Sequence, residues 1–381
     1  MKLEDLLKRY GQVILWFCGF ITFFIFLLPI IAKFSAKIYY REILSGSEKN
    51  AELLAQMGDH MGGSTAPFIG GLACILTFMA FWAQIKANND VQLQFKVQQF
   101  EAQFFEMVRL NRDNVTEMKI NGYTVHEQVS LEQSPGKEHK KISTRIPVER
   151  SIEGRKVFVS MVKELVACFR FAEMINHRNT VDKEMLYKFA YIAFFFGSAS
   201  AMLDEVEIDK DIKKRIISKL KQIRDQHKES LGQKNEYPVW KDKKIDLHIK
   251  YAPFTGHESR LGHYYRHLYS TVKFVVRNHE KGLFNYEQSR DYLKILRGQM
   301  SNDEQLMLYY NYICGFGEEW ENGKNKFFST YRMLHNLPIS RVKCVETPRV
   351  KFHSQIETIR IQTKGTEQMF EWGDYEPVKA Q

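Results

Sequence analysis

Catalytic signatures are absent from this chain of 381 residues. It contains no Walker-type phosphate loop, no G-x-G-x-x-G, no G-x-S-x-G and no H-E-x-x-H. Metal-ligand patterns are equally poor, because His263 and His267 are four apart on an expected helix but no Cys or acidic residue stands at a matching offset. The sequence therefore predicts no metal, no cofactor and a function that is not enzymatic.

Cysteine is scarce and shows no paired pattern. Two of the five Cys, Cys18 and Cys74, lie in apolar runs, and the other three are Cys168, Cys314 and Cys344, without a C-x-x-C pair. A large domain in an oxidising compartment would more often contain paired cysteines. The polar part of the chain is therefore expected in the cytoplasm.

Long apolar runs are missing after residue 86, but two of them precede it. Residues 13–32 and 62–85 carry no charge, and a helix of about 20 residues spans the roughly 30 Å hydrocarbon core of a bilayer. These runs predict a multi-pass membrane anchor over residues 1–86, with both termini on the cytoplasmic side. Small residues that would allow close helix packing in lipid are Gly62, Gly63, Gly70 and Gly71.

The remaining sequence predicts a mainly α fold: two N-terminal transmembrane helices followed by a helical-bundle cytoplasmic domain with a small β or loop excursion. Apolar residues at spacings of three and four favour a stalk helix over 87–118, packed either on its own domain or on a second copy. Turn dipeptides interrupt the pattern in a polar excursion or hairpin at 119–153. The helical domain is expected at 154–337, with a loosely held tail at 338–381. Expected helices in its second half are Arg260–Val276, Tyr286–Met300, Asn302–Tyr312 and Phe327–His335.

Positive charge is in excess, with 55 Lys and Arg against 45 Asp and Glu. A basic domain can be attracted to anionic lipid or to nucleic acid, and the same excess also suits an ordinary solvated surface. Composition leaves these three readings open, so nucleic-acid binding stays undecided.

An Arg followed seven positions later by His, Arg260 and His267, resembles the arrangement in helical-bundle ribonucleases of the HEPN group. An Arg can stabilise phosphate charge and a His can transfer a proton, so the pair suits phosphodiester cleavage. The same spacing also arises by chance in a chain rich in Arg and His. A helix-surface Arg and a structural His are the alternative.

Three segments, which follow one another along the chain, carry a resemblance to a known family. They are Gly262–Tyr269 (GHYYRHLY), Ile295–Asn302 (ILRGQMSN) and Leu308–Asn311 (LYYN). Together they resemble the AbiC-like phage abortive infection proteins. The matching positions are Gly262, His263, Arg266, His267, Tyr269, Lys273, Arg297, Gln299, Ser301, Glu304 and Asn311.

The resemblance implies a bacterial antiphage effector in the inner membrane, whose cytoplasmic domain responds to infection. Its implied partners are the lipid bilayer, further copies of the chain, and a defence-system protein such as a retron reverse transcriptase with its nucleic acid. Two spans joined to a stalk can transmit a change in the domain to the bilayer, so membrane disruption is the leading expectation. The alternatives are a membrane-tethered ribonuclease and a non-toxic sensor or scaffold for another effector. We expect Arg266 and Arg297 to pair with carboxylates such as Glu304 or to face a partner.

Overall fold

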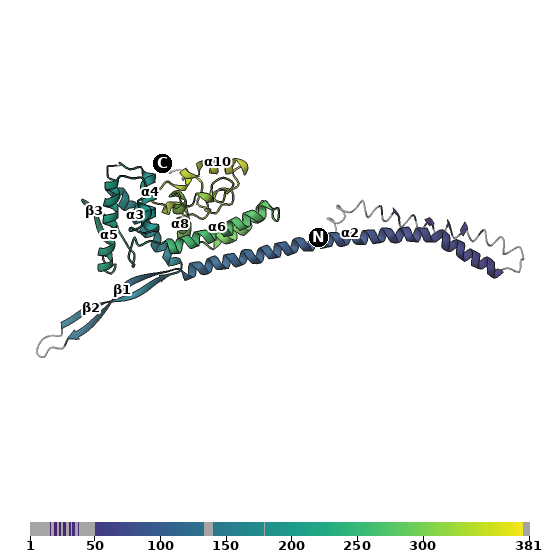
Figure 1. The fold of residues 1–381 in the computed structure, drawn as a ribbon, viewed down its shortest axis with the longest axis horizontal. Coiled ribbons are helices and arrows are strands. Elements are labelled where there is room, and N and C mark those ends of the chain that lie inside the picture. The colour runs from purple at the N-terminus through teal and green to yellow at the C-terminus, as the bar shows by residue number, and fades with distance from the viewer. Residues whose placement is uncertain are drawn as a thin grey trace. The chain divides into compact units, whose positions relative to one another are not determined.

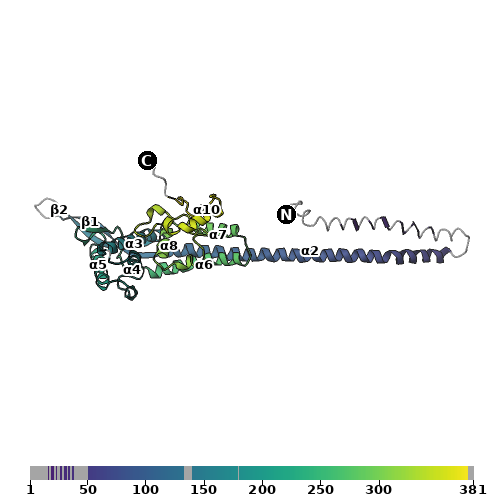
Figure 2. The same ribbon diagram turned by 90° about the horizontal axis from the view of Figure 1, so that it is seen from above.

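The computed structural model describes residues 50–132, 140–178 and 180–375, together with positions 16, 19, 20, 23, 26, 27, 30, 31, 33, 34 and 37. The chain divides into two compact units, Met1–Lys96 and Val97–Gln381. Helices dominate both, which confirms the mainly α prediction (Figures 1 and 2).

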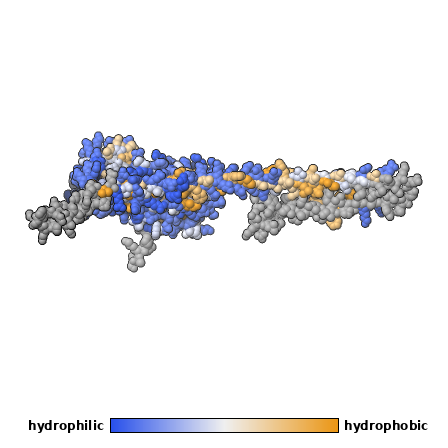
Figure 3. Space-filling view, turned by 90° about the horizontal axis from the view of Figure 1, so that it is seen from below, coloured by the Kyte–Doolittle hydropathy of each residue, from blue (hydrophilic) through white to orange (hydrophobic). Residues whose placement is uncertain are grey.

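The first unit contains most of helix α2, which runs from Asn50 to Glu117 and crosses the boundary between the units. Within it, Gly58–Glu117 is long and apolar enough to cross a membrane, a test of length and composition, and none of its apolar window is buried. Figure 3 shows hydrophobic residues in orange along this part of the helix. The predicted span at 62–85 lies in this helix. The predicted span at 13–32 lies mainly outside the described residues, so two spans remain a prediction.

The C-terminal end of α2 belongs to the second unit and is packed into its core. Phe100 and Phe104 are 3% and 0% exposed. The Phe100 ring stacks on that of Phe274 with 5.0 Å between centroids, and the Phe104 ring meets Tyr292 edge-on at 5.3 Å. The Tyr292 hydroxyl also donates to Glu101 Oε1 at 2.7 Å. Phe100 and Phe104 of the predicted stalk therefore pack on their own domain, whereas Leu93 and Leu110 of the same apolar stripe are 52% and 41% exposed.

Two antiparallel hairpins provide the strands. The strands β1 (Lys119–Glu132) and β2 (Lys140–Glu153) form a hairpin at the predicted excursion. A second, shorter hairpin pairs β3 (Glu236–Trp240) with β4 (Lys243–Asp246). Gly122 in β1 approaches another backbone closely, because a Cβ there would lie 2.3 Å from the Lys250 carbonyl oxygen. The first hairpin is thereby fixed to the chain at Lys250, to which the Tyr123 N–H donates at 2.8 Å.

Helix α3 (Arg155–Ile175) is packed against α4 (Lys183–Phe195), α5 (Lys210–Glu229) and α8 (Asn302–Ile313). Its buried face repeats at helical spacing, with Phe158, Met161, Leu165 and Phe169 each 0% exposed. Most of α4 from Leu186 to Phe195 is buried as well, so α4 is a core helix of the folded unit.

Helices α6 (Glu258–Glu280) and α7 (Tyr286–Gly298) confirm two of the expected helices, and α8 confirms a third. The helix expected at Phe327–His335 is absent, and this segment forms turns. The Glu321 carboxylate accepts hydrogen bonds from the backbone N–H groups of Phe328 and Ser329 at 2.9 and 3.0 Å. Such local side-chain acceptors compete with helical hydrogen bonds.

The region from 338 onward differs from the expected loose tail. It contains α9 (Pro348–Lys351) and α10 (His353–Gln362), and it places Phe352, Met369 and Phe370 in the core at 0% exposure. Short 3-10 turns complete the second unit at Ala201–Leu203 (η1), Glu318–Trp320 (η2) and Ile339–Arg341 (η3).

Candidate functional site

Several motif residues converge on the buried carboxylate of Glu304. Ser301 is the N-cap of α8 and forms a capping box with Glu304, in which the Ser301 hydroxyl donates to Oε1 at 2.7 Å. The Tyr264 hydroxyl of α6 donates to Oε2 at 3.0 Å. Burial raises the pKa of Glu304, while these hydrogen bonds and the charge of Arg155 act in the opposite direction.

The cation that pairs with Glu304 is Arg155, at the start of α3. Its Nε lies 3.6 Å from Glu304 Oε1, and its Nη2 donates to the carbonyl oxygen of Gln299 at 2.6 Å. The predicted pairing of Glu304 with Arg266 or Arg297 is therefore wrong. Arg155 precedes Gln299 by 144 positions, and no local spacing in the sequence relates the two.

Arg297 lies half-buried on α7 and donates from Nη1 to the carbonyl oxygen of Arg332 at 2.9 Å. Burial, together with the positive charge of Arg290, lowers the pKa of Arg297 to about 10. Arg297 therefore helps to hold the turn that follows residue 327, and it has no carboxylate partner among the residues described.

Gly262, Arg266 and Asn311 line one surface hollow of about 500 Å³ between α4, α6 and the end of α8. Asn311 is 5% exposed, and its Oδ1 accepts a hydrogen bond from the Tyr191 hydroxyl at 2.8 Å. The Arg266 side chain is exposed, and within the described part of the chain it makes no hydrogen bond or ion pair. Arg266 is thus the motif residue best placed to contact another molecule.

Two further motif residues stabilise the opposite end of α6. The Tyr269 ring packs edge-on against Trp320 with 5.5 Å between centroids, and its hydroxyl accepts from Asn325 Nδ2 at 2.9 Å. Lys273 Nζ lies 5.3 Å from the centroid of the same ring, a cation–π contact. His263, one residue before Tyr264, is exposed.

The structure does not bring Arg260 and His267 together through a hydrogen bond. Arg260 Nε donates to the carbonyl oxygen of Lys119 at 2.7 Å, which ties α6 to the start of β1. His267 is partly buried, its Nδ1 has no hydrogen-bond partner among described residues, and burial lowers its pKa. Arg260 and His267 are seven residues apart on α6, which corresponds to a rise of about 10 Å along the helix axis.

The glycines proposed for membrane packing, Gly62, Gly63, Gly70 and Gly71, all lie on α2. A Cβ added at any of them would meet no atom within 4 Å. Across the residues that the structure describes, no group of three or more His, Cys, Asp or Glu side chains is arranged to hold a metal ion.

A buried network around Glu164 was not predicted. Glu164 is 0% exposed and accepts hydrogen bonds from the Tyr251 hydroxyl at 2.5 Å and the Phe254 N–H at 2.6 Å, with His257 Nε2 at 2.9 Å. The sequence signal that could have revealed this network is the place of Glu164 on the apolar face of α3. A carboxylate on such a face needs buried hydrogen-bond partners. The network fixes the segment that leads into α6.

Comparison with known proteins identifies one family. Residues 256–342 match the family model described as "Putative phage abortive infection protein". No curated protein and no solved structure matches the chain. The matched segment contains every motif position from Gly262 to Asn311, whereas Phe195 of the surface hollow and Arg155 of the Glu304 network lie outside it. Over residues 256–342 the chain is thus similar to putative phage abortive infection proteins, which supports the AbiC-like resemblance of this segment.

Proposed function

We propose that this chain is an abortive infection effector of the bacterial inner membrane that disrupts membrane integrity when infection is sensed. The family match supports a role in defence. The observation that carries the membrane role is α2, because one helix contains both an exposed apolar stretch and a buried aromatic end.

The two parts of α2 suggest how a signal would reach the bilayer. Phe100 and Phe104 pack against Phe274 and Tyr292, which belong to helices α6 and α7. These two helices also carry motif residues such as Arg266 and Arg297. A rearrangement of α6 and α7 would therefore act directly on the helix that enters the membrane.

Association of several copies would follow from the open glycine positions. Gly70 and Gly71 have free space where a side chain would be, and small residues allow helices to approach closely in lipid. The proposed active state is an oligomer of this chain in the bilayer. A defence-system partner, such as a reverse transcriptase with its nucleic acid, would restrain the domain before infection.

Both termini are proposed to lie in the cytoplasm. Cys168, Cys314 and Cys344 are free thiols, which suits a reducing compartment. A fluorescent reporter fused at Gln381 should be bright, and an alkaline phosphatase fused there should be inactive. The reverse pair of results would show that the orientation is wrong.

The membrane role is tested by a bulky substitution on the open glycine positions. We expect Gly70→Leu to reduce depolarisation of induced cells several-fold, since a bulky side chain prevents the close approach of helices in lipid. Gly58→Leu is the matched control, because Gly58 lies on the same helix, outside the predicted span, with equally open space. Membrane potential is followed with a voltage-sensitive dye at equal protein level. Equal depolarisation by the two variants would contradict the packing role.

The alternatives are separated by RNA integrity measured in the same cells. His267→Asn removes proton transfer at this position, because an amide cannot exchange protons near neutral pH. A membrane effector does not need that transfer, so depolarisation should stay intact. RNA cleavage that precedes depolarisation and is lost in His267→Asn would replace the membrane effector with the ribonuclease. Intact RNA without depolarisation would favour the sensor or scaffold.

A further inference from the structure

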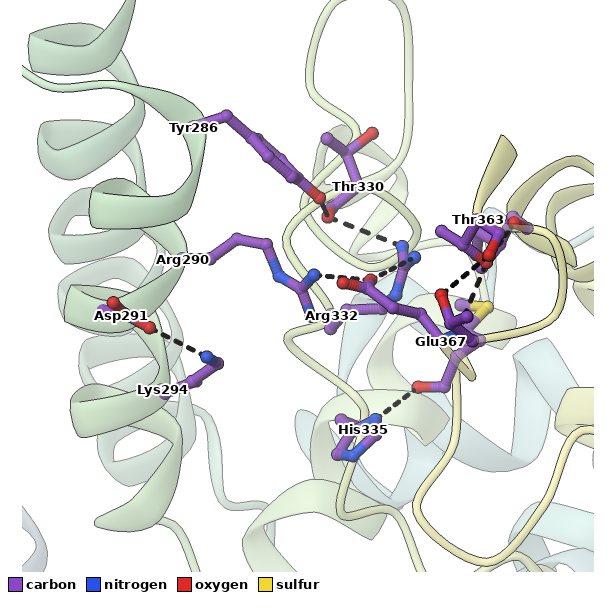
Figure 4. A network of polar contacts seen from close by, with 12 residues as sticks. Tyr286, Arg290, Asp291, Lys294, Thr330, Arg332, His335, Thr363 and Glu367 are labelled. Carbon is purple, nitrogen blue, oxygen red and sulfur yellow. Dashed lines mark hydrogen bonds and ion pairs between the residues drawn. The ribbon is translucent and has the colours of Figure 1, made fainter. Parts of the chain in front are cut away.

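Two arginines, Arg290 and Arg332, meet Glu367 where α7 lies beside the turns after residue 327 and the segment that follows α10 (Figure 4). Arg290 Nη1 lies 2.6 Å from Glu367 Oε2, and Arg332 Nη2 lies 3.5 Å from the same oxygen. Arg297 donates to the backbone carbonyl of Arg332 and adds a third positive charge behind this pair. A single carboxylate oxygen therefore serves two guanidinium groups.

Hydrogen-bond donors are left over in this cluster. Arg332 is 3% exposed, and the Nε groups of Arg332 and Arg297 are buried without a hydrogen-bond partner in the described residues. A buried, charged donor without an acceptor is unfavourable. Burial lowers the pKa of Arg332, and the nearby charge of Arg290 lowers it further. These features indicate that the cluster has more capacity for negative charge than Glu367 fills.

The other nearby carboxylates are already engaged. Glu371 Oε2 accepts from Asn336 Nδ2 at 2.7 Å. Asp374 accepts from the backbone N–H groups of Met369 and Phe370 at 2.9 and 2.8 Å. Their charges still act on Arg297 and Arg332 over distance, but their oxygens are directed to amide donors.

A hollow of about 570 Å³ opens beside Arg332 and Glu367. Its lining is rich in hydroxyl and amide side chains, among them Thr330, Ser354 and Thr358, and it also includes Tyr286. The Tyr286 side chain is 36% exposed, and the Arg290 guanidinium lies 5.8 Å from its ring centroid. Pockets of about 300–1,000 Å³ hold small ligands.

We propose that this cluster binds the phosphoryl group of a small phosphomonoester, and that Glu367 is an internal anion that occupies the place of this group in the free protein. Arg290 and Arg332 would clamp the phosphoryl oxygens, because planar guanidinium groups match tetrahedral oxyanions with two parallel hydrogen bonds. The rest of the ligand would lie in the hollow beside Arg332 and Glu367. Glu367 is 42% exposed, so a change of its side-chain rotamer is enough to vacate the arginines.

Binding is tested by calorimetry on the full-length protein in detergent, with adenosine monophosphate, inorganic phosphate and adenosine as probes. We expect the monophosphate to bind and adenosine, which lacks the phosphoryl group, to bind at least tenfold more weakly. Tighter binding of the monophosphate than of inorganic phosphate supports the site and an organic ligand. Equal binding of the two supports the site with free phosphate as its ligand.

Charge variants connect any binding to this cluster. Arg290→Gln should weaken binding of the monophosphate about tenfold or more, because it removes a charge-assisted contact to the phosphoryl group. Glu367→Gln should strengthen binding about tenfold, because it removes the negative charge that competes for Arg290 and Arg332. Arg360→Gln and Glu357→Gln are matched controls, since Arg360 and Glu357 form an ion pair at 2.7 Å on α10 outside the cluster. We expect both controls to bind within twofold of the unmodified protein.

Three results would overturn the proposal. They are the absence of phosphate and monophosphate binding in both the unmodified protein and Glu367→Gln, equal binding of adenosine and its monophosphate, and equal losses in Arg290→Gln and Arg360→Gln. Arg290 is preferred to Arg332 as the test position, because Arg332 has a backbone φ of 59° and a buried side chain, so its replacement can unfold the segment. The measurement uses purified protein and is independent of the proposed membrane activity.

Discussion

Glu304 and Arg266 show that residues of one family motif have different tasks. Glu304 is buried and satisfied by Ser301, Tyr264 and Arg155, so it organises the packing of α3, α6 and α8. Arg266 lies on the exposed side of α6 without a partner in the described residues. Conventional sequence reasoning could select both as motif positions. It could not separate the structural residue from the accessible one.

Arg266 therefore offers a test of function that is separate from stability. We expect Arg266→Ala to change the free energy of unfolding by no more than about 0.5 kcal/mol, as is usual for exposed residues without specific contacts. The same variant should reduce protection against phage in a plaque assay. Lys210→Ala, at an exposed position on α5, is the control and should protect fully. Plaque counts equal to those of the unmodified protein would show that Arg266 has no role in defence.

At the scale of elements, hydrophobic periodicity predicted most of the helices expected in the second unit. Helices α7 and α8 begin at capping boxes, which carry a local sequence signal in Asn285 and Ser301. The failure at 327–335 has a physical cause, because the Glu321 carboxylate takes backbone donors that a helix would have used. The burial of the last segment was missed because its core residues, such as Phe352 and Met369, pack against distant parts of the unit.

The junction of β1 with α5 gives a pH-dependent prediction. The Tyr123 hydroxyl is hydrogen-bonded to His227 Nδ1, and burial lowers the pKa of His227 from 6.5 to about 4. The neutral imidazole is therefore favoured in the folded state. Its contribution to stability is fully present above pH 6.5 and is lost as the pH falls through the window toward 4.

We expect the unmodified protein to lose about 2 kcal/mol of this contribution between pH 7 and pH 5. His227→Asn keeps a hydrogen-bonding atom near Tyr123 but cannot take up a proton, so its stability should fall less over the same range. Urea unfolding of both proteins at the two pH values measures the difference. Identical pH dependence in the two proteins would assign the effect to other groups.

For the whole molecule, the sequence predicted a membrane anchor over residues 1–86 and a larger helical domain after it, and the structure divides the chain after Lys96. The apolar stretch of α2 was evident because hydropathy is a local property of the sequence. The arginine cluster around Glu367 was not evident. It joins residues that are 77 positions apart, and only the folded chain brings Arg290 and Glu367 together.

The contact between α2 and α7 affects how each copy of the chain is made. Tyr292 and Glu101 are hydrogen-bonded across 191 positions, so the end of α2 is synthesised long before its partner. At about 5–20 residues per second, a ribosome needs roughly 10–40 s to cover that interval. The apolar stretch of α2 precedes Glu101 and is exposed throughout this time. Every nascent copy thus passes through a stage in which this stretch exists before α6 and α7, against which the C-terminal end of α2 packs, and the rate of translation sets how many such copies a cell contains.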